Sequence, residues 1–237
     1  MRRTDLPVLV VLLAVVLSFA LVPGLVGGFE DWTRSWPLLS SFAKFAVLAS
    51  FGECLALRIR TKRWLQPGFG LLPRALAWGA LGVAIYCAFR IFAAGTPALL
   101  ASFSIAAPAG PRPGLSAEGL LAAFAISAAM NLSFGPVLML THKLSDAHIE
   151  ACGGSLLRCL GTVPAIGRYF EEIDWKLMWG FVLKKTIPLF WIPAHTVTFL
   201  LPDWLRVAFA ALLGIVLGVL LASAALGGRL GESSAAS

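Results

Sequence analysis

Two adjoining runs near the C-terminus decide the fold: KKTIPLFWIPAHTVTFLLP (184–202) and LRVAFAALLGIVLGVLLASAAL (205–226). Each run is apolar and about 20 residues long, which is the length that crosses a bilayer as a helix. The first run nevertheless holds Pro188, Pro193, His195, Thr196 and Thr198 at hydrocarbon depth. Such residues are tolerated there only where they face other protein or a water-filled cavity. The two runs therefore indicate a helical membrane protein with a polar, irregular interior element.

The composition extends this interpretation to the whole chain. Of its 237 residues 59% are hydrophobic and 13% are charged, whereas soluble domains carry about 25% charge. The apolar residues fall into six runs, each long enough as a helix for a hydrocarbon core of ~30 Å: Leu6 to Val26, Leu38 to Leu57, Ala75 to Ala94, Gly119 to Thr141, Leu177 to Leu201 and Leu205 to Leu226. We predict an all-α integral membrane protein, a bundle of about six transmembrane helices with one kinked by proline.

The two ends of the chain flank the predicted main bundle, residues 29–226. The first run follows Met1, two arginines and a threonine, as the core of a signal peptide would. Its apolar stretch is longer than the roughly 7 to 15 residues of such a core. We therefore predict that residues 1–28 form an additional transmembrane helix that is retained. Residues 227–237 are mostly small and polar, which predicts a disordered tail.

The positive charges predict the topology. The net charge is +7, and the basic residues cluster before the first run and after the second and fourth: Arg2, Arg3, Arg58, Arg60, Lys62, Arg63, Arg74, Lys143, Arg158, Arg168 and Lys176. By the positive-inside rule this places both termini in the cytoplasm of a multi-pass protein of a bacterial cytoplasmic (inner) membrane. Basic stretches interleaved with exposed aromatic residues are missing, so the expected partner is the lipid bilayer and not nucleic acid.

The sequence contains no recognisable enzyme motif. It has no G-x-S-x-G, no H-E-x-x-H and no phosphate-binding loop, so we expect a protein that is not an enzyme and that uses no cofactor. His142, His148, Cys152 and Cys159 share one predicted cytoplasmic loop. Their spacing matches no usual zinc pattern, so we predict no metal site.

Four small residues recur at every fourth position of the last run: Ala210, Gly214, Gly218 and Ala222. They share one stripe of the helix, and small residues let two membrane helices approach closely. The stripe therefore predicts close helix packing, either within the chain or at a dimer seam.

Ionisable residues inside the runs are candidates for function because a charge near the bilayer centre costs at least ~2.5 kcal/mol. Glu53 lies one turn inside its run, and a short carboxylate cannot reach far toward water. Lys184 and Lys185 lie about two turns inside theirs, where long side chains can extend to the interface. We predict that Glu53 pairs with one of these lysines.

Polar groups closer to mid-depth include Asn131 in the fourth run and His195 with Thr198 in the fifth. Pro188 and Pro193 each remove a backbone donor and free a carbonyl one turn earlier, which kinks a helix. The kinked element therefore either packs helices together through its polar groups or forms one wall of an aqueous path.

The sequence around this element resembles the Mpv17/PMP22 family of small membrane proteins. The resemblance rests on residues 191–206, where an aromatic and a proline precede His195, Thr198-Phe and a final proline and arginine. It also rests on Gly52-Glu53, where the family has glycine and aspartate, and on Arg74. Where the family has glutamine and asparagine, this chain has His195 and Thr198. The resemblance implies a helical bundle with channel-like behaviour.

We therefore predict a non-enzymatic membrane protein that forms a channel or solute pathway. Its candidate polar interior is Glu53, Asn131, Lys184, Lys185, His195 and Thr198. The alternative is a structural or accessory subunit whose polar residues fasten helices and whose surface binds a larger complex. A homo-oligomer and a larger membrane complex are the two assemblies left open.

Overall fold

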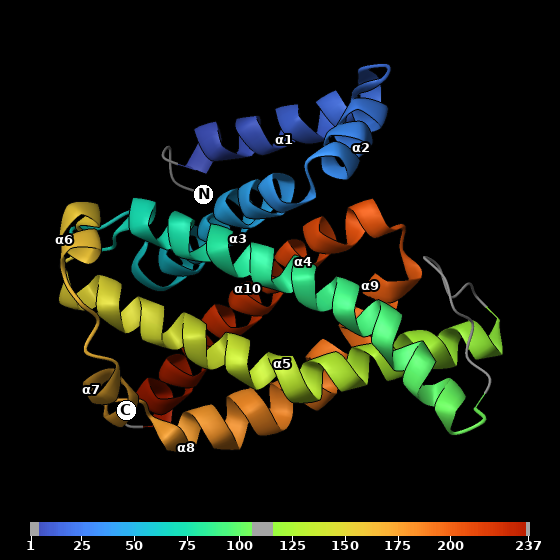
Figure 1. Ribbon diagram of the computed structural model, residues 1–237. Helices are drawn as coiled ribbons and strands as arrows, with labels where there is room; N and C mark the ends of the chain where they lie inside the picture. Colours follow the sequence, from blue (N-terminus) through green and yellow to red (C-terminus); the bar gives the residue numbers. More distant parts are fainter. Residues whose placement is uncertain (1–4, 106–115, 236–237) are drawn as a thin grey trace.

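The computed structural model describes residues 5–105 and 116–235, with side chains as far as Ser223, and all regular secondary structure in these ranges is helical. Figure 1 shows long rods that cross one another, with short helices at one end of the molecule. The elements in chain order are α1 (Leu6–Leu21), α2 (Leu25–Ser35), α3 (Pro37–Thr61), α4 (Leu71–Ser102), α5 (Ala117–Ala151), α6 (Leu156–Gly161), α7 (Ile166–Glu171), α8 (Trp175–Leu177), the π-helix η2 (Met178–Trp191), α9 (Ile192–Leu200) and α10 (Asp203–Ala235).

Four of the described helices are long and apolar enough to cross a membrane, namely α3, α4, α5 and α10. A fifth is added if α1 and α2, which meet at 95°, count as one broken span. The predicted number of about six is not confirmed. The predicted run Leu177 to Leu201 is divided into η2 and α9, which change helix type at Trp191–Ile192, and neither part is long enough by itself.

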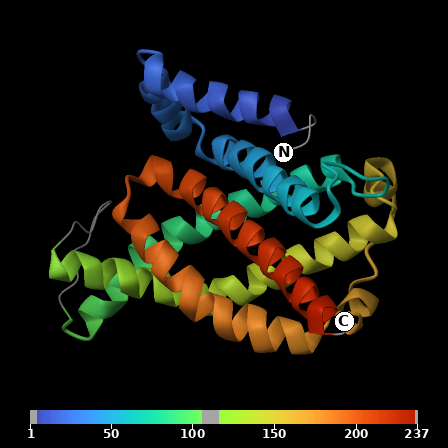
Figure 2. The ribbon, with the colours of Figure 1, turned by 180° about the vertical axis from the view of Figure 1, so that it is seen from behind.

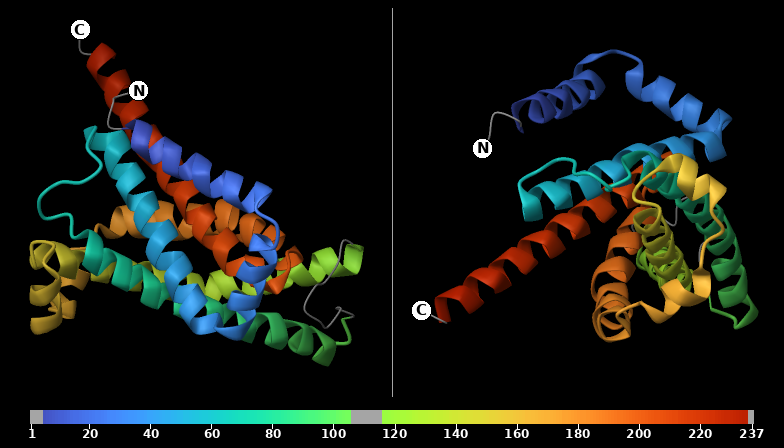
Figure 3. Two further views of the ribbon diagram at one scale, coloured as in Figure 1. Left: turned by 90° about the horizontal axis from the view of Figure 1, so that it is seen from above. Right: turned by 90° about the vertical axis from the view of Figure 1, so that its left-hand side faces the viewer.

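The N-terminal helix lies along the outside of the bundle. No residue of α1 is buried, and its 16 residues span ~24 Å. The carboxylate of Asp5, just before α1, accepts two hydrogen bonds of 2.7 and 2.9 Å from Arg58 at the far end of α3. The first helix therefore runs antiparallel to α3, and α2 crosses back to the start of α3 (Figure 3).

The core forms where α3 meets α4 and α10, and where α5 meets α4 and α9 (Figure 2). The contact between α3 and α4 is close because Gly82 has no side chain. A Cβ built on Gly82 would lie 2.5 Å from the Cβ of Phe45 and 2.7 Å from the carbonyl oxygen of Ser41. The buried core residues are Phe45, Ala49, Ile85, Ala88, Phe89, Ala123, Ile126, Met130, Phe199, Val207, Ala210 and Ala211.

Two long helices extend beyond the predicted runs. Helix α4 continues through Gly95 and Pro97 to Ser102, beyond Ala94, where the predicted run ends. The last helix continues to Ala235, where the sequence predicted a disordered tail from residue 227. The tail sequence contains alanine, leucine, arginine and glutamate, which have high helix propensity, so small size alone does not end a helix.

Candidate functional site

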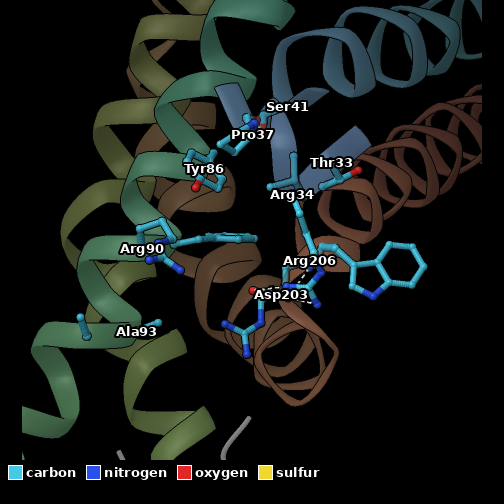
Figure 4. A pocket seen from close by; sticks show the side chains of 13 residues that line it. Thr33, Arg34, Pro37, Ser41, Tyr86, Arg90, Ala93, Asp203 and Arg206 are labelled. Carbon is cyan, nitrogen blue, oxygen red and sulfur yellow. Dashed lines mark hydrogen bonds and ion pairs between the residues drawn. The ribbon is translucent and has the colours of Figure 1, made fainter. Parts of the chain in front are cut away.

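An outer cavity of about 520 Å³ lies between α2, α3, α4 and α10. We call it the vestibule. Figure 4 shows Tyr86 and Arg90 on α4 facing the side chains of Arg34 from α2 and of Asp203 and Arg206 from α10. Its described lining residues are Thr33, Arg34, Pro37, Ser41, Tyr86, Phe89, Arg90, Ala93, Ala94, Asp203, Trp204, Arg206 and Val207.

The charges of the vestibule are unbalanced in favour of cations. Among its described lining residues are three arginines and one acid. Arg34 forms ion pairs with Glu30 at 2.9 Å and with Asp203 at 3.2 Å. Arg206 donates to the backbone carbonyls of Leu201 and Phe199. These anchored guanidinium groups, together with exposed Arg90, create a site that favours anions.

A second cavity, which we call the inner cavity, has a volume of about 340 Å³ and lies between α3, α4, α5, η2, α9 and α10. Most of its wall is apolar, and its polar groups come from only a few positions. Glu53, Trp78 and His142 lie at one end of it, and Asn131, Trp191 and His195 lie along another wall. The sequence gave no reason to group Glu53 with Asn131 and His195. The structure places all three residues at this cavity.

The two cavities follow each other along the same helices. On α3 the vestibule is lined by Pro37 and Ser41 and the inner cavity by residues from Phe45 to Ala56. From Pro37 to Ala56 the helix rises ~28 Å, close to the thickness of a hydrocarbon core. The same order recurs on α10, where the vestibule residues 203–207 precede the inner-cavity residues 210–221.

Phe89 is the residue that lines both cavities. Its side chain is 4% exposed, and its ring meets His195 at 5.6 Å and Phe199 at 5.2 Å between centroids. The ring of Phe89 therefore contributes to the described walls of both cavities.

Asn131 and His195 form a polar cluster that is incomplete. The Asn131 amide donates to the carbonyl of Ser127 at 2.8 Å, which turns its Oδ1 toward Nδ1 of His195 at 3.1 Å. Because Oδ1 can only accept, Nδ1 carries the proton and Nε2 is left as an acceptor. Within the described chain, Nε2 of His195 and Nε1 of Trp191 are buried without a hydrogen-bond partner. The rings of His195 and Trp191 stack at 5.2 Å between centroids, so one unused acceptor lies beside one unused donor in two residues that line the inner cavity.

The polar cluster around Glu53 is, by contrast, fully connected. Glu53 accepts from Arg74 at 2.8 Å and from the indole of Trp78 at 2.6 Å, and its Oε1 lies 3.2 Å from Nε2 of His142. Arg74 also pairs with Asp146. The predicted partners of Glu53, Lys184 and Lys185, are both exposed. The predicted pairing of Glu53 with a lysine is therefore wrong. Arg74 lies in the first turn of the neighbouring helix α4, whereas the two lysines lie on the outer face of η2.

His142 and Asp146 were missed because the sequence ended the fourth run at Thr141. The helix continues to Ala151, and residues four apart share one face. His142 and Asp146 therefore both face Glu53 and Arg74. The four-residue spacing of His142 and Asp146, directly after an apolar run, was the signal in the sequence that could have identified them.

The remaining predicted residues occupy different surroundings. Thr198 is completely buried and donates to Ala194 in its own helix, outside both cavities. Pro188 lies inside η2 and Pro193 lies in the first turn of α9. The predicted irregular element therefore takes the form of a π-helix that continues as an α-helix.

Of the stripe of small residues on α10, Ala210 and Ala222 are buried, whereas a Cβ on Gly214 or Gly218 would meet no atom within 4 Å. Both glycines line the inner cavity.

Comparison with known proteins gives no identification. No protein-family model, curated protein or solved structure matches the chain. The resemblance to the Mpv17/PMP22 family therefore stays a prediction from residues 37–53, Arg74 and residues 191–206.

Proposed function

We propose that this protein is a membrane-embedded solute pathway in which the vestibule and the inner cavity are two compartments separated by Phe89. The observation that carries the proposal is the order of the two cavities along α3 and α10, with one aromatic side chain as their shared wall. An assembly of helices that only fastens itself together has no need of two cavities in series over ~28 Å.

The linings favour a small amphipathic anion. The three vestibule arginines attract negative charge, and the apolar wall of the inner cavity accepts an apolar body. The unpartnered Nε1–H of Trp191 donates to an acceptor on the solute, and Nε2 of His195 accepts from a hydroxyl or amine. Leaving such buried groups unpaired is costly, so a solute that pairs with both is selected over one that pairs with neither.

A flux measurement in proteoliposomes tests this proposal. The probe is para-hydroxybenzenesulfonate, a permanent anion with an apolar ring and a hydroxyl, and the comparison is para-hydroxyphenyltrimethylammonium, which replaces the anionic group with a cationic one. We expect efflux of the anion above that of protein-free liposomes and a slower efflux of the cation. Arg90→Gln should reduce the anion-to-cation ratio, because a vestibule charge is lost.

The partition is tested in the same assay with matched aromatic variants. Phe89→Ala should increase anion efflux because it removes the shared wall. Phe92→Ala is the control, since Phe92 lies on the same helix, packs against the core and lines neither cavity. Equal efflux from wild type, Phe89→Ala and protein-free liposomes would reject a solute pathway.

A structural or accessory subunit is the second candidate, and one observation favours it. No residue of α1 is buried, although its apolar side chains cover its whole circumference. In a membrane such a helix can contact lipid or a second membrane protein. This candidate predicts that deletion of residues 1–21 abolishes an assembly while Phe89→Ala has no effect on flux.

A further inference from the structure

The corner between α5, α6 and α7 brings together one imidazole and two thiols. His148 and Cys152 are four residues apart in the last turn of α5, which places both on one face of the helix. Gly153 and Gly154 follow with positive φ angles of 62° and 71°, a conformation that glycine adopts without strain. This turn folds α6 back on α5, and Cys159 of α6 then faces His148.

The three side chains are close enough to share one ion. Each residue offers one ligand atom: a ring nitrogen of His148 and the sulfurs of Cys152 and Cys159. These three atoms all lie within 4.8 Å of one another. Nε2 of His148 is 3.8 Å from the sulfur of Cys152. In a tetrahedral zinc site, bonds of ~2.0 to 2.3 Å place the ligand atoms roughly 3.5 to 4 Å apart. Small rotations of the side chains therefore suffice to form the site.

The surroundings already orient the imidazole. Nδ1 of His148 lies 3.4 Å from the hydroxyl of Tyr169 on α7, and Nε2 lies 3.0 Å from the carbonyl of Cys159. Because a carbonyl only accepts, Nε2–H of His148 donates to Cys159 in the metal-free arrangement, and Nδ1 accepts from the hydroxyl of Tyr169. Binding of the ion at Nε2 would move the proton to Nδ1, which then donates to the Tyr169 oxygen as the usual second contact of a metal-bound histidine. Tyr169 itself is 4% exposed, so its position is fixed by packing.

We propose that His148, Cys152 and Cys159 form a binding site for a thiophilic divalent cation, with Zn²⁺ as the best match. Two thiolates and one imidazole are the ligands that zinc prefers, and harder cations such as Mg²⁺ and Ca²⁺ prefer oxygen. Cys159 is partly exposed, which gives the ion a route from solvent and leaves the fourth coordination position to water. The bound ion ties α6 to the end of α5. The proposal departs from the expectation based on spacing alone, because the Gly153–Gly154 turn supplies the proximity that the sequence pattern does not display.

The site is independent of the solute pathway, since none of its three ligands lines the vestibule or the inner cavity. Its test therefore needs no transport activity. The other two cysteines, Cys54 and Cys87, lie on α3 and α4 and supply matched controls.

The experiment titrates the reduced, full-length protein in detergent with Co²⁺, which reports tetrahedral thiolate coordination by its absorption, and then displaces it with Zn²⁺. We expect one cobalt ion per chain, displaced by one equivalent of Zn²⁺. Cys152→Ser and Cys159→Ser should each abolish the thiolate-to-cobalt band of the wild type or weaken binding more than tenfold, whereas Cys87→Ser should bind as the wild type does. Tyr169→Phe should keep the band and weaken binding by about tenfold, the usual effect of losing a second contact.

A measurement on the wild type covers the case in which the serine variants fail to fold. Zn²⁺ should protect Cys152 and Cys159, but not exposed Cys87, from alkylation by N-ethylmaleimide, as read by peptide mass spectrometry. The proposal is overturned if the reduced protein binds no Co²⁺ above buffer, if Cys87→Ser removes the band, or if Zn²⁺ leaves alkylation of Cys159 unchanged. It is also overturned if Cys152 and Cys159 form a disulfide in air and the reduced protein binds no metal.

Discussion

Two polar clusters line the inner cavity, and they differ in whether their hydrogen bonds are complete. Around Glu53, the carboxylate contacts Arg74, Trp78 and His142, and Arg74 reaches Asp146 as well. Around His195, the imidazole contacts Asn131 on one side, and its Nε2 has no partner within the described chain. The neighbouring indole nitrogen of Trp191 is unpartnered too.

The difference indicates a difference in role. A buried ion cluster with all partners in place holds helices together, and it becomes costly only when one member is removed. A buried donor and acceptor without partners weaken the folded protein, and such groups persist where something else pairs with them. We therefore assign stability to the Glu53 cluster and solute contact to the His195 cluster.

The largest expected effect is on the Glu53 cluster. Arg74→Met removes the shared cation and strands Glu53 and Asp146, so we expect a loss of ~3 to 5 kcal/mol in the free energy of unfolding. The measurement is thermal melting in detergent. Arg60→Met at the exposed end of α3 is the control and should change stability by less than ~0.5 kcal/mol. Adding Glu53→Gln and Asp146→Asn to Arg74→Met should recover part of the loss; no recovery would show that the charges are not the cause.

Packing provides a second contrast, between filled and open parts of the bundle. Gly82→Ala places a Cβ against Phe45 and the backbone of α3, and we expect a cost of ~1 to 3 kcal/mol from overpacking. Gly214→Ala meets no atom within 4 Å, so it should be neutral or gain up to ~1 kcal/mol from helix propensity. The two variants are compared by melting temperature under identical conditions. Equal destabilisation by both would contradict the open space at Gly214.

A larger side chain in the inner cavity should separate stability from flux. Gly218→Leu fills part of the cavity without meeting a neighbouring atom at its Cβ. We expect a melting temperature close to that of the wild type and a reduced efflux of para-hydroxybenzenesulfonate. A large loss of folded yield would instead support the close helix packing at Gly218 that the sequence predicted.

The sequence was sufficient for the helical class, because hydropathy and residue type carry that information directly. Asn131 and His195 were paired in the prediction only as neighbours in depth, and the structure joins them at 3.1 Å. The partner of Glu53 was predicted incorrectly, since depth alone does not say which helices are adjacent. The convergence of Phe89, Trp191 and His195 on one cavity depends on helix crossing, and the proximity of Cys152 and Cys159 depends on a turn. Neither has a signature in a single sequence.

The most direct measurement of the assigned roles combines melting and flux for Trp191→Phe. This variant keeps an aromatic ring beside His195 and removes the N–H that has no partner, together with part of the indole ring. The control is Trp179→Phe, because Trp179 lies on the same helix, is exposed and lines neither cavity. We expect Trp191→Phe to change the free energy of unfolding by less than ~0.5 kcal/mol. Anion efflux should fall about fivefold, as the loss of one hydrogen bond of ~1 kcal/mol predicts. Unchanged efflux in a stable Trp191→Phe protein would contradict the assignment of solute contact to this cluster.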